Sequence, residues 1–185
     1  MPGRVTVYVE LETSGDVVCP ECGRGCRRHD TRRRKWRHLD TMQAQTVLVA
    51  EVPRADCPEH GVKQMRVPWA EPGSRFTAMF EVLVIDWLKA AKGNISAVAA
   101  RLGMTWDEVD GVMARAVRRG LGRREVQSPR RFGVDETSFK RRHQYVTVVA
   151  DLDTHRVLHV ADGRGKAALS GYLQGLTAKQ PRSWA

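Results

Sequence analysis

Residues 19–26 read CPECGRGC, and residues 57–61 read CPEHG. Each stretch sets two potential metal ligands three positions apart, with a glycine directly after the pair: Cys19 with Cys22, and Cys57 with His60. A two-residue gap lets one tight turn direct both side chains at one ion, and Zn²⁺ favours four thiolate or imidazole ligands in a tetrahedron. We therefore predict a zinc ribbon whose ion is structural, because no ligand position is left for water. Cys26 stays open as an alternative ligand.

The sequence around these pairs alternates between apolar and polar residues. Residues 5–11 have the two-residue period of a half-buried strand, and residues 46–52 read as another strand that Pro53 ends. Between them, residues 24–38 read RGCRRHDTRRRKWRH and are too rich in guanidinium groups to pack inward. We expect this segment to contact phosphate, with Trp36 packing on the ribbon or stacking; a solvated basic loop is the alternative. The candidate DNA contacts here are Arg32, Arg33, Arg34, Lys35 and Arg37.

A second motif follows the turn-rich residues 68–73. Apolar residues from 76 to 87 recur at helical spacing, and residues 95–114 then read ISAVAARLGMTWDEVDGVMA. A small residue at Ala99 and a turn at Gly103 favour a helix-turn-helix, although an ordinary pair of packed helices has the same spacing. Acidic residues at the start of the last helix repel phosphate, so we expect backbone contacts further along. The candidate DNA contacts are Thr105, Trp106, Arg115, Arg118, Arg119, Arg123 and Arg124.

Composition supports a polyanionic partner. The chain has 185 residues, a formal net charge of +10 and a pI of about 10.0. This excess of positive charge points to nucleic acid as the partner, and the alternative is a basic ribosome-associated or merely soluble protein. No run approaches the ~18 apolar residues of a membrane span, so we expect a cytoplasmic, nucleoid-associated protein. Four clustered cysteines in a reducing compartment indicate metal binding in preference to disulfides.

The last third of the sequence predicts short strands at 131–138, 144–151 and 156–161, followed by a helix at 166–176. Asp135 lies near the end of the first strand, where ribonuclease-H-like nucleases place a first ligand for magnesium ions. On the residues alone, three other acidic side chains qualify equally: Glu136, Asp151 and Asp153.

Taken together, these motifs resemble the ISL3 family of bacterial insertion-sequence transposases. The matching stretches are CPECGRGC, WRHLD, CPEHGV, VPWAEPGSRFT, the helix-turn-helix and FGVDETSFKRRHQYVTVVADLD. The resemblance implies an α+β, multi-domain chain. Its parts are a zinc ribbon at 1–68, a helix-turn-helix domain at 73–124, a linker at 125–130 and the first three strands and helix of a ribonuclease-H-like domain at 131–185.

By position, the resemblance assigns the zinc to Cys19, Cys22, Cys57 and His60, and the first catalytic acid to Asp135. It implies a transposase that binds terminal inverted repeats as double-stranded DNA, and an intact parent that cuts and rejoins DNA with Mg²⁺ or Mn²⁺. The alternative is a non-enzymatic DNA-binding regulator; a zinc-ribbon protein of translation or transcription would leave VPWAEPGSRFT and the Asp135 strand unexplained.

The family places its second aspartate and its glutamate beyond the last predicted helix, and residues 181–185 do not resemble the strand that leads there. We therefore expect a truncated, catalytically incomplete enzyme. An incomplete sheet leaves an unpaired edge, which predicts poor solubility or pairing with a second copy or with the full-length transposase through residues 131–180.

Overall fold

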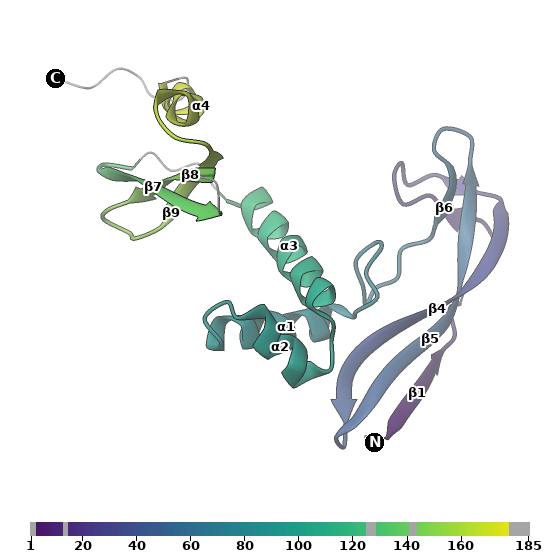
Figure 1. The fold of residues 1–185 in the computed structure, drawn as a ribbon. Coiled ribbons are helices and arrows are strands. Elements are labelled where there is room, and N and C mark those ends of the chain that lie inside the picture. The colour runs from purple at the N-terminus through teal and green to yellow at the C-terminus, as the bar shows by residue number, and fades with distance from the viewer. Residues whose placement is uncertain (1–2, 13–14, 125–128, 141–143, 178–185) are drawn as a thin grey trace. The chain divides into compact units, whose positions relative to one another are not determined.

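The protein combines α and β structure in two compact units, Met1–Arg123 and Arg124–Ala185. A computed structural model describes residues 3–12, 15–124, 129–140 and 144–177 (Figure 1). Within these ranges, no helix is both long enough and apolar enough to cross a membrane. The linker predicted at 125–130 and the end at 181–185 lie largely outside the described residues.

A four-stranded sheet forms the first part of unit 1. Its order is β1-β5-β4, with β6 pairing further along β5. The strands are β1 (Arg4–Val9), β4 (Arg28–Thr41), β5 (Ala44–Cys57) and β6 (Gly61–Gln64). A separate antiparallel pair, β2 (Val17–Val18) and β3 (Gly25–Cys26), brings the first two cysteines toward the end of β5. The long β4–β5 hairpin thus forms the centre of the sheet, and β1 and β6 add to it along β5 (Figure 1).

The structure decides one alternative for this hairpin and corrects one expectation. The arginine-rich segment forms strand β4, not the basic loop that was the alternative, and its two-residue period directs Trp36 inward, where it is 3% exposed. Strand β5 also runs past Pro53, which lies opposite Thr31. The Pro53 carbonyl accepts from Met65 N, and the N and C=O of a strand residue point to the same side. The missing N–H therefore costs no hydrogen bond to β4.

Three helices complete unit 1, and the predicted helix-turn-helix is confirmed. They are α1 (Ala78–Ala90), α2 (Ile95–Leu102) and α3 (Trp106–Gly122). Gly103 takes the left-handed conformation that ends α2, with φ 63°. Thr105 and Glu108 form the predicted capping box at the start of α3. The helices bury a common core that includes Phe80, Val84, Val98, Val109 and Val112.

Backbone bonds join the sheet to the helices. Arg37 N donates to Arg75 O at 2.9 Å, and Thr77 N donates to Arg37 O at 3.0 Å. The His38 ring shares a 2.8 Å hydrogen bond with the Thr77 hydroxyl, which is also the N-cap of α1, and Leu39 packs against the helical core. The two parts predicted as separate domains, 1–68 and 73–124, therefore pack on each other; the boundary between them stays a prediction.

Unit 2 is a three-stranded antiparallel sheet with one helix. The strands β7 (Phe132–Lys140), β8 (Gln144–Asp151) and β9 (Val157–Asp162) follow sequence order, and α4 spans Lys166–Thr177. The Tyr172 ring of α4 lies 6.2 Å from Phe132 and 5.4 Å from His159, so α4 covers one sheet face. This succession of three strands and a helix is the one that the sequence predicts.

Candidate functional site

The two predicted ligand pairs come together in unit 1. Cys19 and Cys22 lie on the turn between β2 and β3, whereas Cys57 is the last residue of β5 and His60 lies on the turn that follows it. Left-handed glycines at Gly23 and Gly61, with φ of 72° and 65°, close these two turns. All four ligand atoms lie within 4.8 Å of one another. We call these four residues the Cys/His cluster.

The spacing within the Cys/His cluster fits a tetrahedral ion. The Sγ atoms of Cys22 and Cys57 lie 3.8 Å apart, and His60 Nδ1 lies 3.9 Å from Cys19 Sγ and 3.5 Å from Cys57 Sγ. Ligand atoms about 2.3 Å from a central ion are separated by about 3.8 Å along the edges of a tetrahedron. The three thiols and one imidazole therefore suit a metal that prefers sulfur and nitrogen.

Local electrostatics favour the thiolate form of Cys57. Burial would raise the pKa of this thiol, but the backbone N–H groups of His60 and Glu59 donate to the sulfur, and the net effect lowers the pKa to about 7. Cys19 and Cys57 are buried, whereas Cys22 and His60 reach the surface. A metal here would be enclosed on one side by the protein, and all of its ligand positions would be occupied.

Cys26, the alternative ligand, stands outside the Cys/His cluster. It is buried on β3, and its Sγ is 3.5 Å from the Arg24 carbonyl oxygen, to which it donates. Cys26 nevertheless lies near the cluster, and burial together with the neighbouring Cys57 raises the pKa of its thiol. A protonated thiol bonded to a carbonyl fits a structural role.

The predicted DNA contacts on β4 divide by their orientation. Arg32, Arg33, Arg34 and Lys35 are exposed. Arg37 is not: its side chain is 15% exposed, it pairs with Asp40 at 2.5 Å, and its guanidinium lies 5.0 Å above the Phe80 ring. Arg37 thus fastens the strand to α1, and this arrangement leaves it little access to a partner.

The predicted contacts on α3 and at its two ends divide in the same way. Arg118, Arg123 and Arg124 are exposed, as is Trp106. The other two arginines turn inward: Arg115 reaches Glu81 at 2.7 Å, and Arg119 bridges Glu81 at 3.1 Å and Glu71 at 2.6 Å. Thr105 accepts from Glu108 N as the helix cap. The spacing of these residues in the sequence does not distinguish paired from free arginines, because Glu81 is far away along the chain.

The predicted catalytic residue, Asp135, lies exposed on β7 opposite Val148. Its carboxylate accepts a 3.0 Å hydrogen bond from the Thr137 hydroxyl. Since paired residues of neighbouring strands share a face, Asp135 lies on the face opposite the Val149 and His159 side that α4 covers. Across the described ranges, no group of three or more potential metal ligands forms around it.

The three acidic alternatives to Asp135 have structural partners. Glu136 accepts from Gly165 N at 2.7 Å. Asp151 is buried and accepts from the N–H groups of Thr154 and Asp153, which lower its pKa. Asp153 also pairs with Arg131. Asp151 and Asp153 are thus held by local structural contacts, whereas Asp135 and Glu136 are both exposed and each accepts one hydrogen bond.

Comparison with known proteins assigns each part of the chain to one family. Residues 16–60 match the model for the zinc-finger of transposase IS204/IS1001/IS1096/IS1165, and residues 65–117 match the helix-turn-helix domain of transposase family ISL3. Residues 132–183 match the DDE transposase model of the same family. No solved structure matches the chain.

Curated relatives agree with these matches. The chain is 35% identical over 167 residues to the transposase for insertion sequence element IS1557 of Mycobacterium tuberculosis, covering 88% of this chain and 37% of that protein. It is 25% identical over 177 residues to the transposase for insertion sequence element IS1001 of Bordetella parapertussis, covering 95% of this chain and 43% of that protein. The chain thus spans less than half the length of these relatives. It belongs to the ISL3 family of insertion-sequence transposases.

Proposed function

We propose that unit 1 binds the inverted repeats at the ends of an insertion sequence and that the Cys/His cluster holds a structural zinc ion. One observation carries the proposal: a Cys/His set that fits a tetrahedral ion and a capped helix-turn-helix share one compact unit, with exposed arginines on β4 and on α3. Each feature alone has other uses, but together they support DNA recognition in a protein whose relatives are named transposases for insertion sequence elements.

Zinc is the metal proposed for the Cys/His cluster because three thiols and one imidazole disfavour the hard ions Mg²⁺ and Ca²⁺. When bound, it would fasten the turn at Cys19–Cys22 to the turn at Cys57–His60. It would leave no open position for substrate, so its contribution is to the fold.

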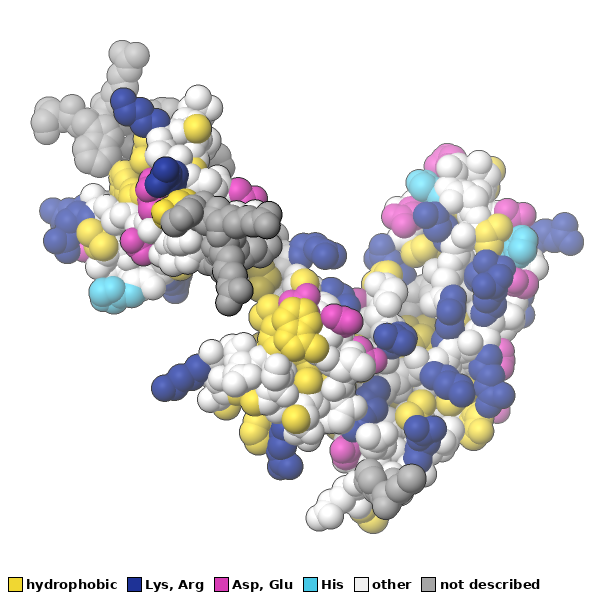
Figure 2. Space-filling view, in the orientation of Figure 1, with side chains coloured by type: hydrophobic (Ala, Val, Ile, Leu, Met, Phe, Trp, Pro, Cys, Tyr) yellow, Lys and Arg dark blue, Asp and Glu magenta, His cyan; other side chains and the backbone are white. Residues whose placement is uncertain are grey.

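The proposed DNA surface follows the exposed guanidinium groups. In the space-filling view, Lys and Arg side chains gather over the strand-rich part of unit 1 (Figure 2). We place the contacts on Arg32, Arg33, Arg34 and Lys35 of β4 and on Arg118, Arg123, Arg124, Thr105 and Trp106 of the α3 region. Arg37, Arg115 and Arg119 are omitted because carboxylates already hold them.

Selection from a random duplex library tests the proposed specificity. We expect the enriched sequence to match a repeat in the DNA that flanks the gene, and binding to weaken steeply between 50 and 200 mM salt because most contacts are to phosphate. Failure to retain any duplex at low salt would overturn the proposal.

For unit 2, we propose that Asp135 supplies the first ligand for Mg²⁺ or Mn²⁺ in the full-length transposase. Since no further ligands gather around it within the described residues, we propose that this chain alone binds DNA without cutting it. A labelled duplex carrying the selected repeat, incubated with Mg²⁺ or Mn²⁺, should be shifted but stay intact. Metal-dependent cleavage that Asp135→Ala abolishes would contradict this.

We also propose that unit 2 mediates self-association. Its sheet exposes Val134, Val157 and Val160, and neither β7 nor β9 has an outer partner strand within the described residues. An unpaired edge beside apolar side chains is a site for pairing with another strand. Light scattering should find dimers for the whole chain and monomers for a chain ending at Arg124; monomers in both would remove the idea.

A further inference from the structure

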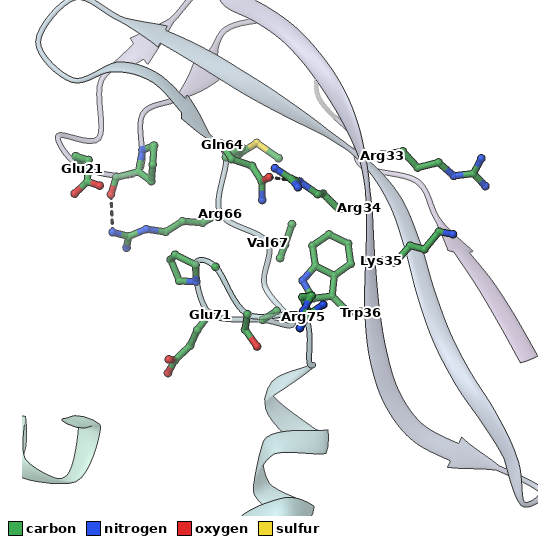
Figure 3. A pocket seen from close by; sticks show the side chains of 16 residues that line it. Glu21, Arg33, Arg34, Lys35, Trp36, Gln64, Arg66, Val67, Glu71 and Arg75 are labelled. Atoms are coloured by element: carbon green, nitrogen blue, oxygen red, sulfur yellow. Dashed lines mark hydrogen bonds between the residues drawn. The ribbon is translucent and has the colours of Figure 1, made fainter. Parts of the chain in front are cut away.

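A hollow of about 550 Å³ lies in unit 1 between the sheet and the segment that leads from the sheet to the helices. One wall is β4, and the other is the segment 65–75, which carries most of the VPWAEPGSRFT motif that the proposed function leaves without a role. Figure 3 shows Arg34 reaching from β4 toward Gln64 and Arg66 reaching from the 65–75 segment toward Pro20, whereas Arg33 and Lys35 point away from the hollow. We call this space the basic hollow.

Neutral groups orient the two arginines in the basic hollow. Arg34 Nε donates to the Gln64 side-chain oxygen at 2.6 Å, and Arg66 Nη2 donates to the Pro20 carbonyl oxygen at 2.5 Å. Within the described ranges, neither guanidinium forms an ion pair. By contrast, Arg54 is held by Asp30 and Arg115 by Glu81. Arg34 and Arg66 are thus fixed in position, while their charge is available.

The other wall of the basic hollow is held firmly in place. The Trp69 ring meets the buried Trp36 ring edge-on, with centroids 5.4 Å apart. Glu71 accepts from Arg119, and the Ser74 hydroxyl donates to Glu81 at 2.8 Å. The segment is therefore anchored to the sheet at one end and to the helices at the other. Because the donors are already positioned, little conformational entropy would be lost when a ligand enters.

The mouth of the basic hollow extends along a basic row. Arg32 lies two residues before Arg34 and therefore on the same face of β4, about 7 Å away. Arg75, whose side chain is 76% exposed, lines the hollow and meets Glu108 in a single contact at 3.5 Å. A row of guanidinium groups leading into a hollow suits a polyanion with regularly spaced charges better than it suits one small ion.

We propose that the basic hollow binds backbone phosphates of duplex DNA, which Arg34 of β4, Arg66 of the 65–75 segment and Arg75 at the mouth would contact. This inference rests on the proposed DNA binding by unit 1 and assigns a role to the segment between the Cys/His cluster and the helix-turn-helix. Guanidinium groups match phosphate oxygens with paired N–H donors, so two of them fixed on different elements define both the position and the direction of the DNA strand.

The sharpest test changes the partner of Arg34 and leaves the arginine in place. Gln64→Glu is nearly isosteric and would pair the Arg34 guanidinium with a carboxylate, so DNA would compete with an internal anion. Arg66→Gln removes the positive charge of the second arginine in the basic hollow. The matched control is Lys89→Gln, which changes the net charge by the same amount in the last turn of α1, about 17 Å along the helix from its start.

Binding to one arbitrary 30-base-pair duplex would be measured between 50 and 200 mM salt. The slope of log affinity against log salt is negative, and each hollow variant should reduce its magnitude by about 1. Lys89→Gln should leave the slope near that of the wild type. Metal content and circular dichroism confirm that the variants are folded. Wild-type slopes in both hollow variants, or an equal decrease in Lys89→Gln, would overturn the inference while DNA binding stands. A wild-type chain that binds no duplex would overturn the proposed function itself.

Discussion

The two ends of unit 1 are held together by different means. At the Cys/His end, the buried side chains are small: Val17, Cys19, Cys26, Ala55 and Cys57. At the helical end, the buried set is larger and includes two phenylalanines, a leucine and several valines. Buried apolar area scales with the size of these side chains, so the helical end has its own source of stability and the Cys/His end has little. The comparison indicates that a metal ion held by the Cys/His cluster would take the place of a hydrophobic core at that end.

Metal removal should have the largest effect, and the Cys/His end and the helical end should respond to it differently. Zinc binding in isolated zinc-finger peptides is worth about 10–16 kcal/mol, and little at the Cys/His end would replace it. We expect chelation, or Cys57→Ser, to disorder residues 16–26 and 57–64 while the helical circular dichroism of α1–α3 persists. Amide exchange resolved by residue would measure this.

Cys26→Ser is the matched control for metal removal, since Cys26 is equally buried but lies outside the Cys/His cluster. It should retain one metal ion per chain. Loss of metal in Cys26→Ser, or an end that stays ordered without metal, would show that the comparison between the two ends is wrong.

The next largest effect concerns the helical end. The Glu81 side chain is 3% exposed and is satisfied by Arg115, Arg119 and the Ser74 hydroxyl. Glu81→Gln would leave two guanidinium groups without their shared anion, and breaking a buried pair costs about 3–5 kcal/mol. Urea unfolding followed by helical circular dichroism would measure the loss.

Glu71→Gln provides the comparison for Glu81→Gln because its side chain is about a third exposed and shares Arg119. Its cost should be below about 1 kcal/mol, as for exposed ion pairs. Equal effects of the two substitutions would mean that burial does not decide the strength of this network.

Local patterns were sufficient to predict much of this fold. Ligand pairs with glycines, the capping box at Thr105 and the strand alternation of unit 2 all depend on neighbours within a few residues, and the structure has them where the sequence predicts. Recurrence at short range is what periodicity and capping rules detect.

Long-range pairing explains what the sequence did not predict. The sequence left a basic loop open as the alternative for β4 because its arginines mask the inward position of Trp36. Strand β5 was ended too early because the sequence does not show that the backbone N of Pro53 faces away from β4. Among the predicted DNA contacts, Arg115 and Arg119 differ from Arg118 only through Glu81, 34 or more residues away. Charge counts do not reveal which arginines are paired with carboxylates. For the same reason, the sequence alone did not single out Arg66 and Arg75 as candidate DNA contacts.

A smaller effect should come from the cap of α3. The Thr105 hydroxyl accepts from Glu108 N at 3.2 Å, and Thr105→Ala removes this bond at a typical cost of about 1 kcal/mol. Thr105→Ser keeps the acceptor and should cost much less. Both are measured by urea unfolding of the helical end. A shift in metal affinity with either would mean that the two ends are coupled more tightly than their separate cores suggest.

The smallest effect tests how far along the β4–β5 hairpin the structure depends on bound metal. Arg54 of β5 donates to both carboxylate oxygens of Asp30 on β4 at 2.5 Å, and this holds the pKa of Asp30 at about 2. A lowered pKa means that the pair contributes stability above pH ~4, the ordinary aspartate range, and that this contribution is lost as the pH falls toward 2. Metal should already have left by then, because thiolates and imidazole take up protons at higher pH.

The Asp30 carboxyl therefore reports whether the hairpin outlasts the metal. If β4 and β5 are held by Trp36 and the helices, a carbon-13 titration of Asp30 should have its midpoint near pH 2, and Arg54→Gln should move it toward 4. If the hairpin opens when the metal leaves, the wild-type midpoint should itself lie near 4. The second result would contradict our expectation that metal dependence is confined to the two turns, because it would extend that dependence along the arginines proposed to meet DNA.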